Sequence, residues 1–372
     1  MRVLILHASA GAGHRRAAEA LQKGFLSENS KAEVKVCDIL DFTPAVFRRT
    51  YAKGYLDVVR KAPELWGFMY AQSDRKALIP WRRKVRSFVN QVNTPPFVRF
   101  YEEFNPDAVV CTHFMPLELL STRMRRGKLA TPLFCVVTDF AVHSLWILEG
   151  VQTYYVATEE AKRQLVRRGQ PEGQVKVTGI PIDPVFSERT PRDEARRQLG
   201  LPGDMPFVLV LSGGFGVGPT AELLRALGTA DLNCRILVVA GANEEMRQQA
   251  LVISKQVRTP VTVFGFVNNI HALMDASDII ISKPGGLTTS EILAKGKPLI
   301  IIDPIPGQEQ RNCEYLLEAG AAARLFDVED AGFKVQSLLT DRKRLTQMAK
   351  NAARIGSPHA ARTIARDIMG RM

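Results

Sequence analysis

The chain alternates short apolar segments with longer helix-like ones, and this alternation limits the folds open to it. Apolar segments of strand length occupy residues 3–7, 32–36, 108–112, 133–138, 153–156 and 175–178 in the first half, and 207–212, 235–240, 261–264, 279–282 and 299–303 in the second. Helix-like stretches, such as 15–26 and 160–168, separate them. Strands connected through helices form right-handed βαβ units. The pattern therefore predicts an α/β protein with two doubly wound parallel sheets.

A proline-rich connector divides the two sets of strands. The run Gly179-Ile180-Pro181-Ile182-Asp183-Pro184-Val185-Phe186 contains two prolines and a glycine, which end regular structure. At 372 residues the length also favours two domains. We expect a first domain at 1–186, a second at 187–357, and a basic C-terminal helix at 358–372 that returns to the first domain.

The composition narrows the class of protein. Its 46% hydrophobic and 24% charged residues are ordinary for a soluble globular protein. The apolar run at residues 1–6 is too short for a signal peptide, and no run approaches the roughly 18 apolar residues of a transmembrane helix. The five cysteines are scattered without a Cys-x-x-Cys pair, which favours buried thiols over disulfides or a zinc site. We therefore expect a cytoplasmic protein.

The net charge of +12 points to an anionic partner, and one segment concentrates it. Residues 48–86 mix lysines and arginines with aliphatic and aromatic side chains, including Trp66 and Trp81. Such a mixture suits the interface of an anionic membrane, where apolar side chains enter the acyl boundary and cations meet headgroups. The alternative is a pair of ordinary surface helices with buried aromatics. No nucleic-acid-binding motif accompanies the charge, so we expect no nucleic acid partner.

The residues after strand 279–282 are the strongest candidate for a ligand site. Lys283-Pro284-Gly285-Gly286-Leu287-Thr288 join this strand to a helix expected to start at Ile292. A strand, a turn of small residues and a helix N-terminus make an anion site from backbone N–H groups and the helix dipole. Glu291 would then reach a ribose diol. The alternative is a capping box, in which Thr288 and Glu291 only satisfy the helix end.

Three further loops follow strands of the second half, where ligands of open α/β sheets bind. They contain Gly213-Gly214-Phe215-Gly216, Gly265-Phe266-Val267 and Pro306-Gly307-Gln308-Glu309. Glycines allow a diphosphate to approach the backbone, and Gln308 and Glu309 are placed to bind ligand hydroxyls. Each loop also has a structural alternative without a ligand. The first would be a strained strand–helix turn, the second a loop without a specific role, and the third a solvated loop and helix start.

In the first domain, two loops after strands carry acid–base groups. Gly11-Ala12-Gly13-His14 follows strand 3–7, and His14 sits at a helix start, where the dipole lowers its pKa. A neutral histidine there suits a general base. The alternative is a helix-start histidine that is only hydrogen-bonded to the backbone. Asp139 and His143 follow strand 133–138 and are candidates for acid–base work or for orienting His14.

Together these motifs, in this order, resemble the group of monogalactosyldiacylglycerol synthases and processive diacylglycerol glucosyltransferases. This group belongs to glycosyltransferase family 28 and adopts the GT-B fold. The matching pieces extend over nearly the whole chain and include Gly11–His14, Thr138–Phe140 with His143 and Trp146, Gly179–Pro181, Gly213–Gly216, Gly265–Val267, Lys283–Gly286 with Thr288 and Glu291, and Pro306–Glu309 with Asn312. The resemblance implies two Rossmann-like domains facing across a cleft.

The resemblance also implies a role for each matching residue. A UDP-sugar donor would bind the second domain through Gly214, Phe215 and Gly216 at the diphosphate, Lys283, Gly285, Gly286 and Thr288 at the same group, Gly265, Phe266 and Val267 at uracil, Glu291 at the ribose, and Gln308 and Glu309 at the sugar. A lipid acceptor would meet the first domain at Gly13, Arg15, His143, Trp146, Trp66 and Trp81. His14 is the candidate base and Asp139 the alternative.

The implied reaction is inverting transfer of a hexose from a UDP-sugar to diacylglycerol or a related lipid, in glycolipid biosynthesis. No Asp-x-Asp motif occurs, so we expect neither a metal nor another cofactor. The alternatives are a transferase of N-acetylglucosamine to a polyprenyl-diphosphate lipid, a UDP-sugar 2-epimerase, and a peripheral membrane protein that retains a nucleotide pocket. We expect a peripheral location on the cytoplasmic face of an anionic membrane.

Overall fold

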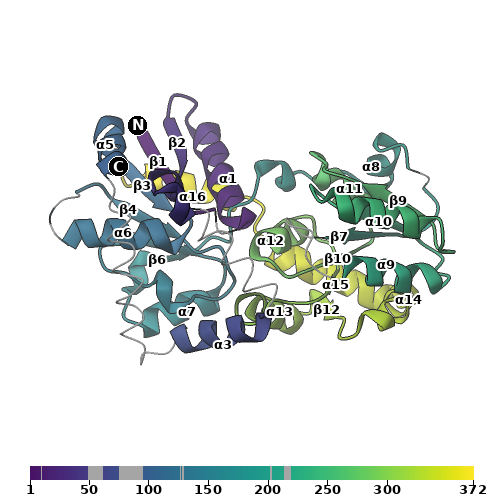
Figure 1. Ribbon diagram of the computed structural model, residues 1–372. Helices are drawn as coiled ribbons and strands as arrows, with labels where there is room; N and C mark the ends of the chain where they lie inside the picture. Colours follow the sequence, from purple (N-terminus) through teal and green to yellow (C-terminus); the bar gives the residue numbers. More distant parts are fainter. Residues whose placement is uncertain are drawn as a thin grey trace. The chain divides into compact units, whose positions relative to one another are not determined.

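The computed structural model describes residues 1–9, 11–48, 62–74, 95–125, 127, 130–201, 203–212 and 219–372. They form two compact units (Figure 1). The first contains residues 1–184, 305–311 and 357–372, and the second contains residues 185–304 and 312–356. The chain leaves the first unit at Pro184, and its C-terminal residues belong to that unit again.

The first unit is built on a six-stranded parallel sheet. Its strands are β1 (Arg2–His7), β2 (Glu33–Asp38), β3 (Ala108–Cys111), β4 (Leu133–Val136), β5 (Thr153–Val156) and β6 (Val175–Val177). Their order is β2-β1-β3-β4-β5-β6, and every neighbouring pair is parallel. The chain therefore changes direction across the sheet between β1 and β3. Ligands of such sheets bind at this switch point, outside the carboxyl ends of the strands.

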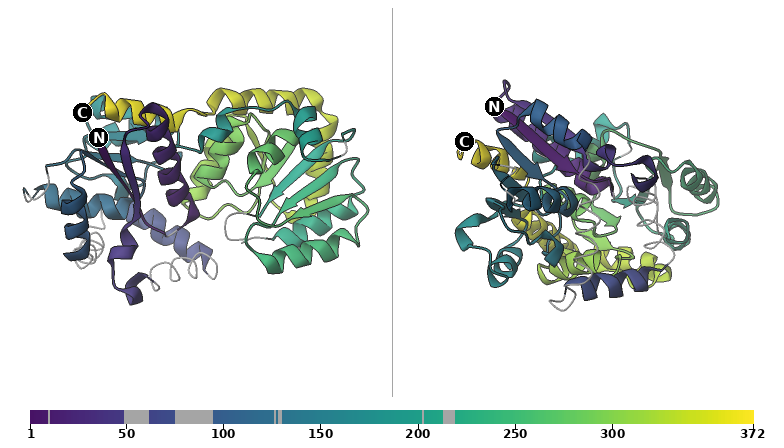
Figure 2. Two further views of the ribbon diagram at one scale, coloured as in Figure 1. Left: turned by 90° about the horizontal axis from the view of Figure 1, so that it is seen from above. Right: turned by 60° about the vertical axis from the view of Figure 1, so that its left-hand side comes forward.

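Helices bury both faces of this sheet. Alternate strand residues point to opposite faces, so Leu4 and Leu6 pack on one side while Val3 and Ile5 pack on the other. The second side is covered by α1 (Ala12–Glu28) and α16 (Ala360–Met369), which lie against each other (Figure 2). A Cβ at Gly24 would lie 2.7 Å from the Ala361 oxygen, so only glycine allows this approach.

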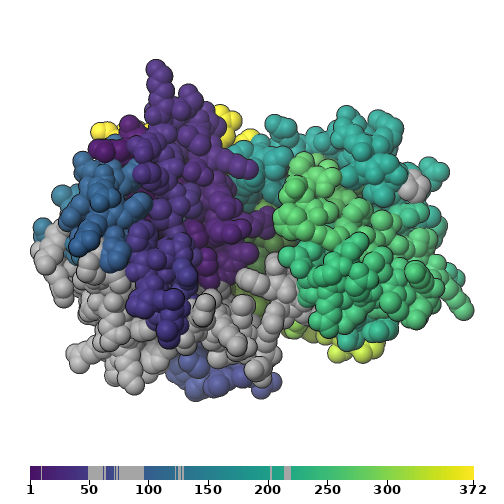
Figure 3. Space-filling model, turned by 45° about the horizontal axis from the view of Figure 1, so that its top comes forward, coloured from purple at the N-terminus to yellow at the C-terminus, as the bar shows by residue number. Residues whose placement is uncertain are grey.

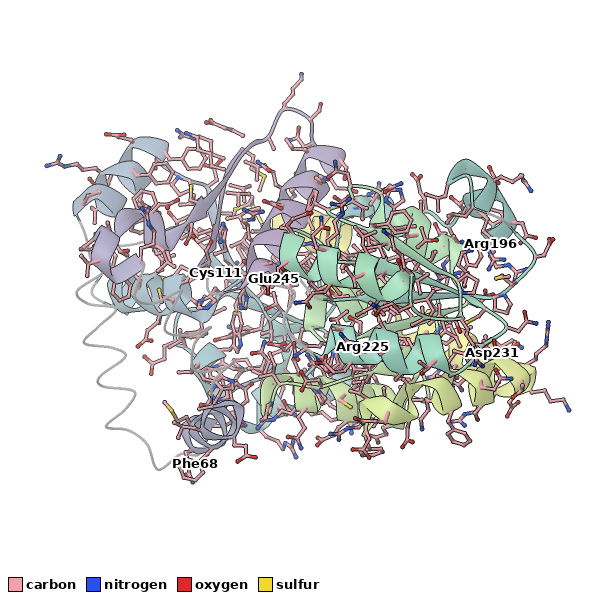
Figure 4. The ribbon with its side chains drawn as sticks, turned by 45° about the vertical axis from the view of Figure 1, so that its right-hand side comes forward. Phe68, Cys111, Arg196, Arg225, Asp231 and Glu245 are labelled. Carbon is pink, nitrogen blue, oxygen red and sulfur yellow. The ribbon has the colours of Figure 1, made fainter. Side chains whose placement is uncertain are left out.

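The remaining elements of the first unit lie around the sheet. They are η1 (Ile39–Phe42), α3 (Pro63–Asp74), α5 (Pro95–Phe104), α6 (Phe114–Arg125), η2 (Ser144–Trp146), α7 (Glu159–Arg167) and η3 (Glu172–Gln174). The outer side of α3 exposes Leu65, Phe68 and Met69, and this helix lies at the molecular surface in Figure 3. Phe68 projects away from the ribbon in Figure 4. Trp81 lies outside the described residues.

The second unit repeats the architecture. Its strands are β7 (Phe207–Leu211), β8 (Arg235–Val239), β9 (Val261–Phe264), β10 (Ile279–Ser282), β11 (Leu299–Ile301) and β12 (Ala322–Arg324). Their order is β12-β11-β10-β7-β8-β9, again fully parallel, with the switch point between β7 and β10. The predicted α/β class with two doubly wound sheets is confirmed, but β12 was not predicted.

The helices of this part of the chain complete the second core. They are η4 (Pro184–Ser187), α8 (Arg192–Gln198), α9 (Thr220–Thr229), α10 (Glu244–Ser254), α11 (Ile270–Ala276), α12 (Gly286–Ala294), α13 (Gln308–Glu318), η5 (Val328–Asp330), α14 (Ala331–Thr340) and α15 (Arg342–Ile355). Helices α9, α10 and α14 pack on Val208 and Val210 of the central strand. Within the described ranges, no helix has the length and apolar character needed to cross a bilayer.

Candidate functional site

His14 lies at the switch point of the first sheet. Helix α1 begins at Ala12, directly after the loop that follows β1, so His14 occupies its first turn. Its Nδ1 lies 2.8 Å from the carbonyl oxygen of Thr112 and 3.0 Å from the hydroxyl of Thr138. These threonines follow β3 and β4. The ends of three strands thus hold one imidazole ring.

The hydrogen bond to Thr112 fixes the tautomer of His14. A carbonyl oxygen can only accept, so Nδ1 carries the proton and Nε2 presents a lone pair. Burial lowers the pKa of His14, while the Asp139 carboxylate and the Thr112 carbonyl oppose this effect. The direction agrees with the sequence-based expectation, but burial rather than the helix dipole is the main cause. A neutral imidazole with an available Nε2 is the form that a general base requires.

Aromatic rings surround His14. The His113 ring packs edge-on at 4.5 Å between centroids, and Trp146 lies 6.3 Å away. Both are buried, and His113 Nδ1 accepts from the Met115 amide at 3.0 Å. Burial holds the pKa of His113 well below its usual value, so no cation stands beside His14 from this side. His113 is not among the residues predicted from the sequence, although its position just after a strand is a usable signal.

Asp139 is held by a side chain from a distant part of the sequence. The Nε2 atom of Gln308 donates to both carboxylate oxygens, at 3.0 and 2.9 Å. Residues 305–311 belong to the first unit, which brings Gln308 to the candidate acceptor side. Glu309 instead accepts from the Ile305 amide at 2.9 Å and so closes the start of α13. That contact agrees with the helix-start alternative for Glu309.

His143 does not orient His14. Its Nδ1 accepts from the Leu145 amide at 3.2 Å, so its Nε2 carries the proton and donates to the Tyr70 carbonyl at 3.1 Å. The ring also packs on Tyr70, with centroids 4.3 Å apart. The expectation that His143 orients His14 is therefore wrong, because both ring nitrogens of His143 are engaged elsewhere and the Thr112 carbonyl holds Nδ1 of His14. The Asp139 carboxylate acts on His14 through its charge.

The other acceptor-side residues differ in exposure. The spaces beside Gly11 and Gly13 are open: among the described residues, apart from the neighbouring chain, no atom lies within 4 Å of an added Cβ, which leaves room for a ligand near His14. Arg15 is exposed and pairs with Glu19 at 3.3 Å. Trp66 is half-buried, whereas its neighbours Leu65 and Phe68 are exposed. The apolar contact surface of α3 is thus made by Leu65 and Phe68 more than by Trp66.

In the second unit, α12 starts at its switch point. The helix begins at Gly286 with Gly285 as its N-cap, six residues before the predicted start. Thr288 and Glu291 therefore both lie within the helix, and no side chain caps it. The capping-box alternative is wrong. Glu291 is 2% exposed in the second turn, and the backbone N–H groups of the first turn point out of the helix end.

Two polar contacts fix the turn between β10 and α12. The ammonium of Lys283 lies 2.6 Å from Asp303, which follows β11 and has a left-handed backbone with φ 39°. Asn312, fully buried, donates to the Pro284 carbonyl at 3.0 Å. Together they place a cation and a rigid turn at the helix N-terminus. Gly214, Phe215 and Gly216, predicted at the same point, lie outside the described residues.

The candidate base-binding loop follows β9. Phe266 is 73% exposed, so its ring is available to a ligand. A Cβ at Gly265 would lie 3.2 Å from the Arg247 side chain, which makes glycine the residue that fits without displacing it. Val267 follows just before α11.

Both halves of the chain match known protein families. Residues 14–182 match the family Monogalactosyldiacylglycerol (MGDG) synthase, and residues 191–355 match Glycosyl transferases group 1. A protein of Bacillus pumilus named processive diacylglycerol beta-glucosyltransferase is 30% identical over 368 residues, which cover 99% of this chain and 94% of the relative. A Bacillus cereus protein of the same name is 31% identical over 362 residues, covering 97% and 91%.

Solved structures support the fold. MurG of Acinetobacter baumannii matches with a TM-score of 0.64 and 15% identity, covering 100% of this chain and 99% of that one. The UDP-GlcNAc 2-epimerase of Neisseria meningitidis, bound to UDP-GlcNAc, matches with a TM-score of 0.60 and 15% identity over the full length of both. The predicted GT-B class, with two Rossmann-like domains, is confirmed. The chain therefore belongs to the glycosyltransferase family of the MGDG synthases and processive diacylglycerol beta-glucosyltransferases.

Proposed function

We propose that this protein transfers a hexose from a UDP-sugar to a hydroxyl of diacylglycerol or a related lipid, with inversion at the anomeric carbon. The observation that carries the proposal is the fixed tautomer of His14, whose Nδ1–H is held by Thr112 at 2.8 Å. Its Nε2 is left to take the proton of an acceptor hydroxyl. The relatives' names give the acceptor and sugar classes.

The reaction balances as one displacement. The acceptor oxygen bonds to the anomeric carbon as the bond from that carbon to the UDP oxygen breaks, and the hydroxyl proton passes to His14 Nε2. Negative charge then grows on the diphosphate. The N-terminus of α12 and the ammonium of Lys283 supply donors and positive charge for it. Asp139 remains the alternative base, because its carboxylate acts on His14 through its charge.

We propose that this reaction needs no metal ion, since the helix N-terminus and Lys283 supply the electrostatic stabilisation. We also propose that the enzyme works on the surface of an anionic membrane. The exposed Leu65 and Phe68 of α3 support this, because apolar side chains on one helix side suit insertion among lipid chains.

The test is transfer of radiolabel from UDP-glucose, UDP-galactose and UDP-N-acetylglucosamine into liposomes that contain diacylglycerol, with and without EDTA. Labelled glycolipid from one donor, unchanged by EDTA, is the expected result. Label that enters only a polyprenyl-diphosphate lipid, offered in parallel liposomes, would favour the alternative transferase of N-acetylglucosamine. Conversion of the UDP-sugar to its 2-epimer, without lipid label, would favour the epimerase alternative.

A further inference from the structure

The largely buried carboxylate of Asp74, which is separate from the candidate base, connects four segments of the first unit. Asp74 is the last residue of α3. It accepts from the Ser144 amide at 2.8 Å, from Arg168 at 3.0 and 3.3 Å, and from Arg311 at 2.7 Å. Its side chain is only 9% exposed. Two guanidinium groups and a backbone N–H thus converge on one anion, which is a strong and directional arrangement.

Helix α3 packs closely on residues 306–311. A Cβ at Gly67 would lie 2.5 Å from Pro306, and a Cβ at Gly307, where φ is +92°, would lie 2.6 Å from the Tyr70 ring. No side chain fits at either glycine without a shift. The guanidinium of Arg311 also lies 5.6 Å from the centre of the Tyr70 ring. Gly67 and Gly307 therefore allow α3 to pack closely on residues 306–311, and the hydrogen bond from Arg311 to Asp74 adds a polar contact between the same two segments.

Two of the residues that donate to Asp74, Arg311 and Ser144, belong to elements that carry groups of the candidate site. Arg311 and Gln308 lie one helical turn apart on α13, so an anchor on Arg311 fixes the turn from which Gln308 reaches Asp139. Ser144 begins η2, which carries Trp146 beside His14. The described contacts of Asp74 with Ser144 and Arg311 thus connect it to both elements that carry groups of the candidate site.

We propose that Asp74 is a positioning residue for the reaction proposed above: it anchors Arg311 and η2, and thereby places Gln308 on Asp139 and Trp146 beside His14. The same carboxylate ties these groups to α3, the helix with the exposed Leu65 and Phe68. This inference rests on the proposed function, and its test has one readout that does not depend on turnover.

The kinetic test is a double-mutant cycle between Asp74→Asn and Gln308→Ala in the label-transfer assay. Asp74→Asn keeps the size of the side chain but removes its charge, and we expect kcat to fall about 10- to 100-fold, as for a small misplacement of a reacting group. In the Gln308→Ala background the same change should have a clearly smaller effect, because the contact of Gln308 with Asp139 is already lost and only the placement of Trp146 remains to be disturbed. Independent, multiplicative effects of the two changes would overturn the proposal.

The second readout is hydrogen–deuterium exchange of the full-length variants without substrate. Asp74→Asn should speed exchange in residues 305–311 and 144–147, while Glu33→Gln, which removes an exposed carboxylate paired with Lys35, should not. Unchanged exchange in both segments would overturn the proposal even if the wild-type protein transferred no label. Arg311→Met breaks the same contact from its more exposed partner and serves if Asp74→Asn fails to fold. A wild-type protein without transfer activity would contradict the proposed function instead.

Discussion

The backbone carbonyl of Thr112 lies 2.8 Å from Nδ1 of His14 and thereby decides which nitrogen of that ring can accept a proton. The contact joins residues 98 positions apart, and it exists because β1 and β3 are neighbours at the switch point of the sheet. The Thr112 hydroxyl also donates to the His14 carbonyl at 2.9 Å. The orientation of the candidate base therefore depends on the fold, which supplies the backbone carbonyl, and on the hydroxyls of Thr112 and Thr138.

The pH profile of transfer should report the environment of His14. Burial lowers the pKa of His14 and the Asp139 carboxylate partly restores it, so kcat/KM should fall on the acid side with an apparent pKa below 6.5. Asp139→Asn removes the restoring charge and should move this limb to still lower pH. A limb that stays in place or moves to higher pH in the variant would contradict the assigned electrostatics.

Glu291 should contribute to the binding of the nucleotide. Because Glu291 does not form a capping box, Glu291→Gln should not cost helix-end stability, whereas loss of a charged hydrogen bond to a ribose would raise the Kd for UDP about 10- to 100-fold. Calorimetric titration with UDP measures this. Glu245→Gln, at an exposed carboxylate of α10 in the same unit (Figure 4), is the control. Equal affinities of the two variants would remove the ribose role.

The outer side of α3 should govern binding to vesicles. Leu65 is 53% exposed and Phe68 is 62% exposed. Replacing both with Ser removes these apolar side chains, so the fraction of protein that floats with anionic liposomes should fall several-fold. Val252→Ser, at a 57% exposed valine of α10 in the second unit, is the matched control. If the control loses as much binding as the double variant, the α3 surface has no special role.

Asp74 should stabilise the fold in a manner that acid removes. Burial raises the pKa of this carboxyl, but hydrogen bonds from Arg168 and Arg311, the charge of His143 and the Ser144 amide together lower it to about 2. The ordinary pKa is 3.8, so the lowered pKa of Asp74 stabilises the folded state by about 2 kcal/mol above pH 3.8. This stabilisation is lost as the carboxylate is protonated, when the pH falls through about 2.

The measurement is urea unfolding of the wild type and Asp74→Asn between pH 5 and pH 2. The difference in unfolding free energy between the two proteins should shrink over that range. A difference that stays constant would mean that the charge of Asp74 does not stabilise the fold.

Much of the fold could be predicted from the sequence because buried parallel strands leave continuous apolar runs. The segments 153–156, 261–264 and 279–282 coincide with β5, β9 and β10. The missed strand β12, Ala322–Arg324, is short and consists of two alanines and an arginine, so it carries no such run. The sequence predicts a later start for α12 because Gly285 and Gly286 are typical of a loop, whereas the helix begins at Gly286 with Gly285 as its N-cap.

The candidate site was predictable only in part. Residues that follow strands, such as His14 and Asp139, could be found because the carboxyl ends of parallel strands meet at one edge. Contacts made by backbone atoms leave no trace in residue types, so the role of Thr112 could not be predicted. The bond between Asp74 and Arg311 joins residues 237 positions apart and depends on which loop returns to the first unit.

The most direct test of the central claim is turnover of His14→Ala in the label-transfer assay, with UDP affinity measured in parallel. If His14 takes the acceptor proton, kcat should fall about 10²- to 10⁴-fold while the Kd for UDP stays near that of the wild type. Turnover close to the wild-type rate would contradict the account and leave Asp139 as the base.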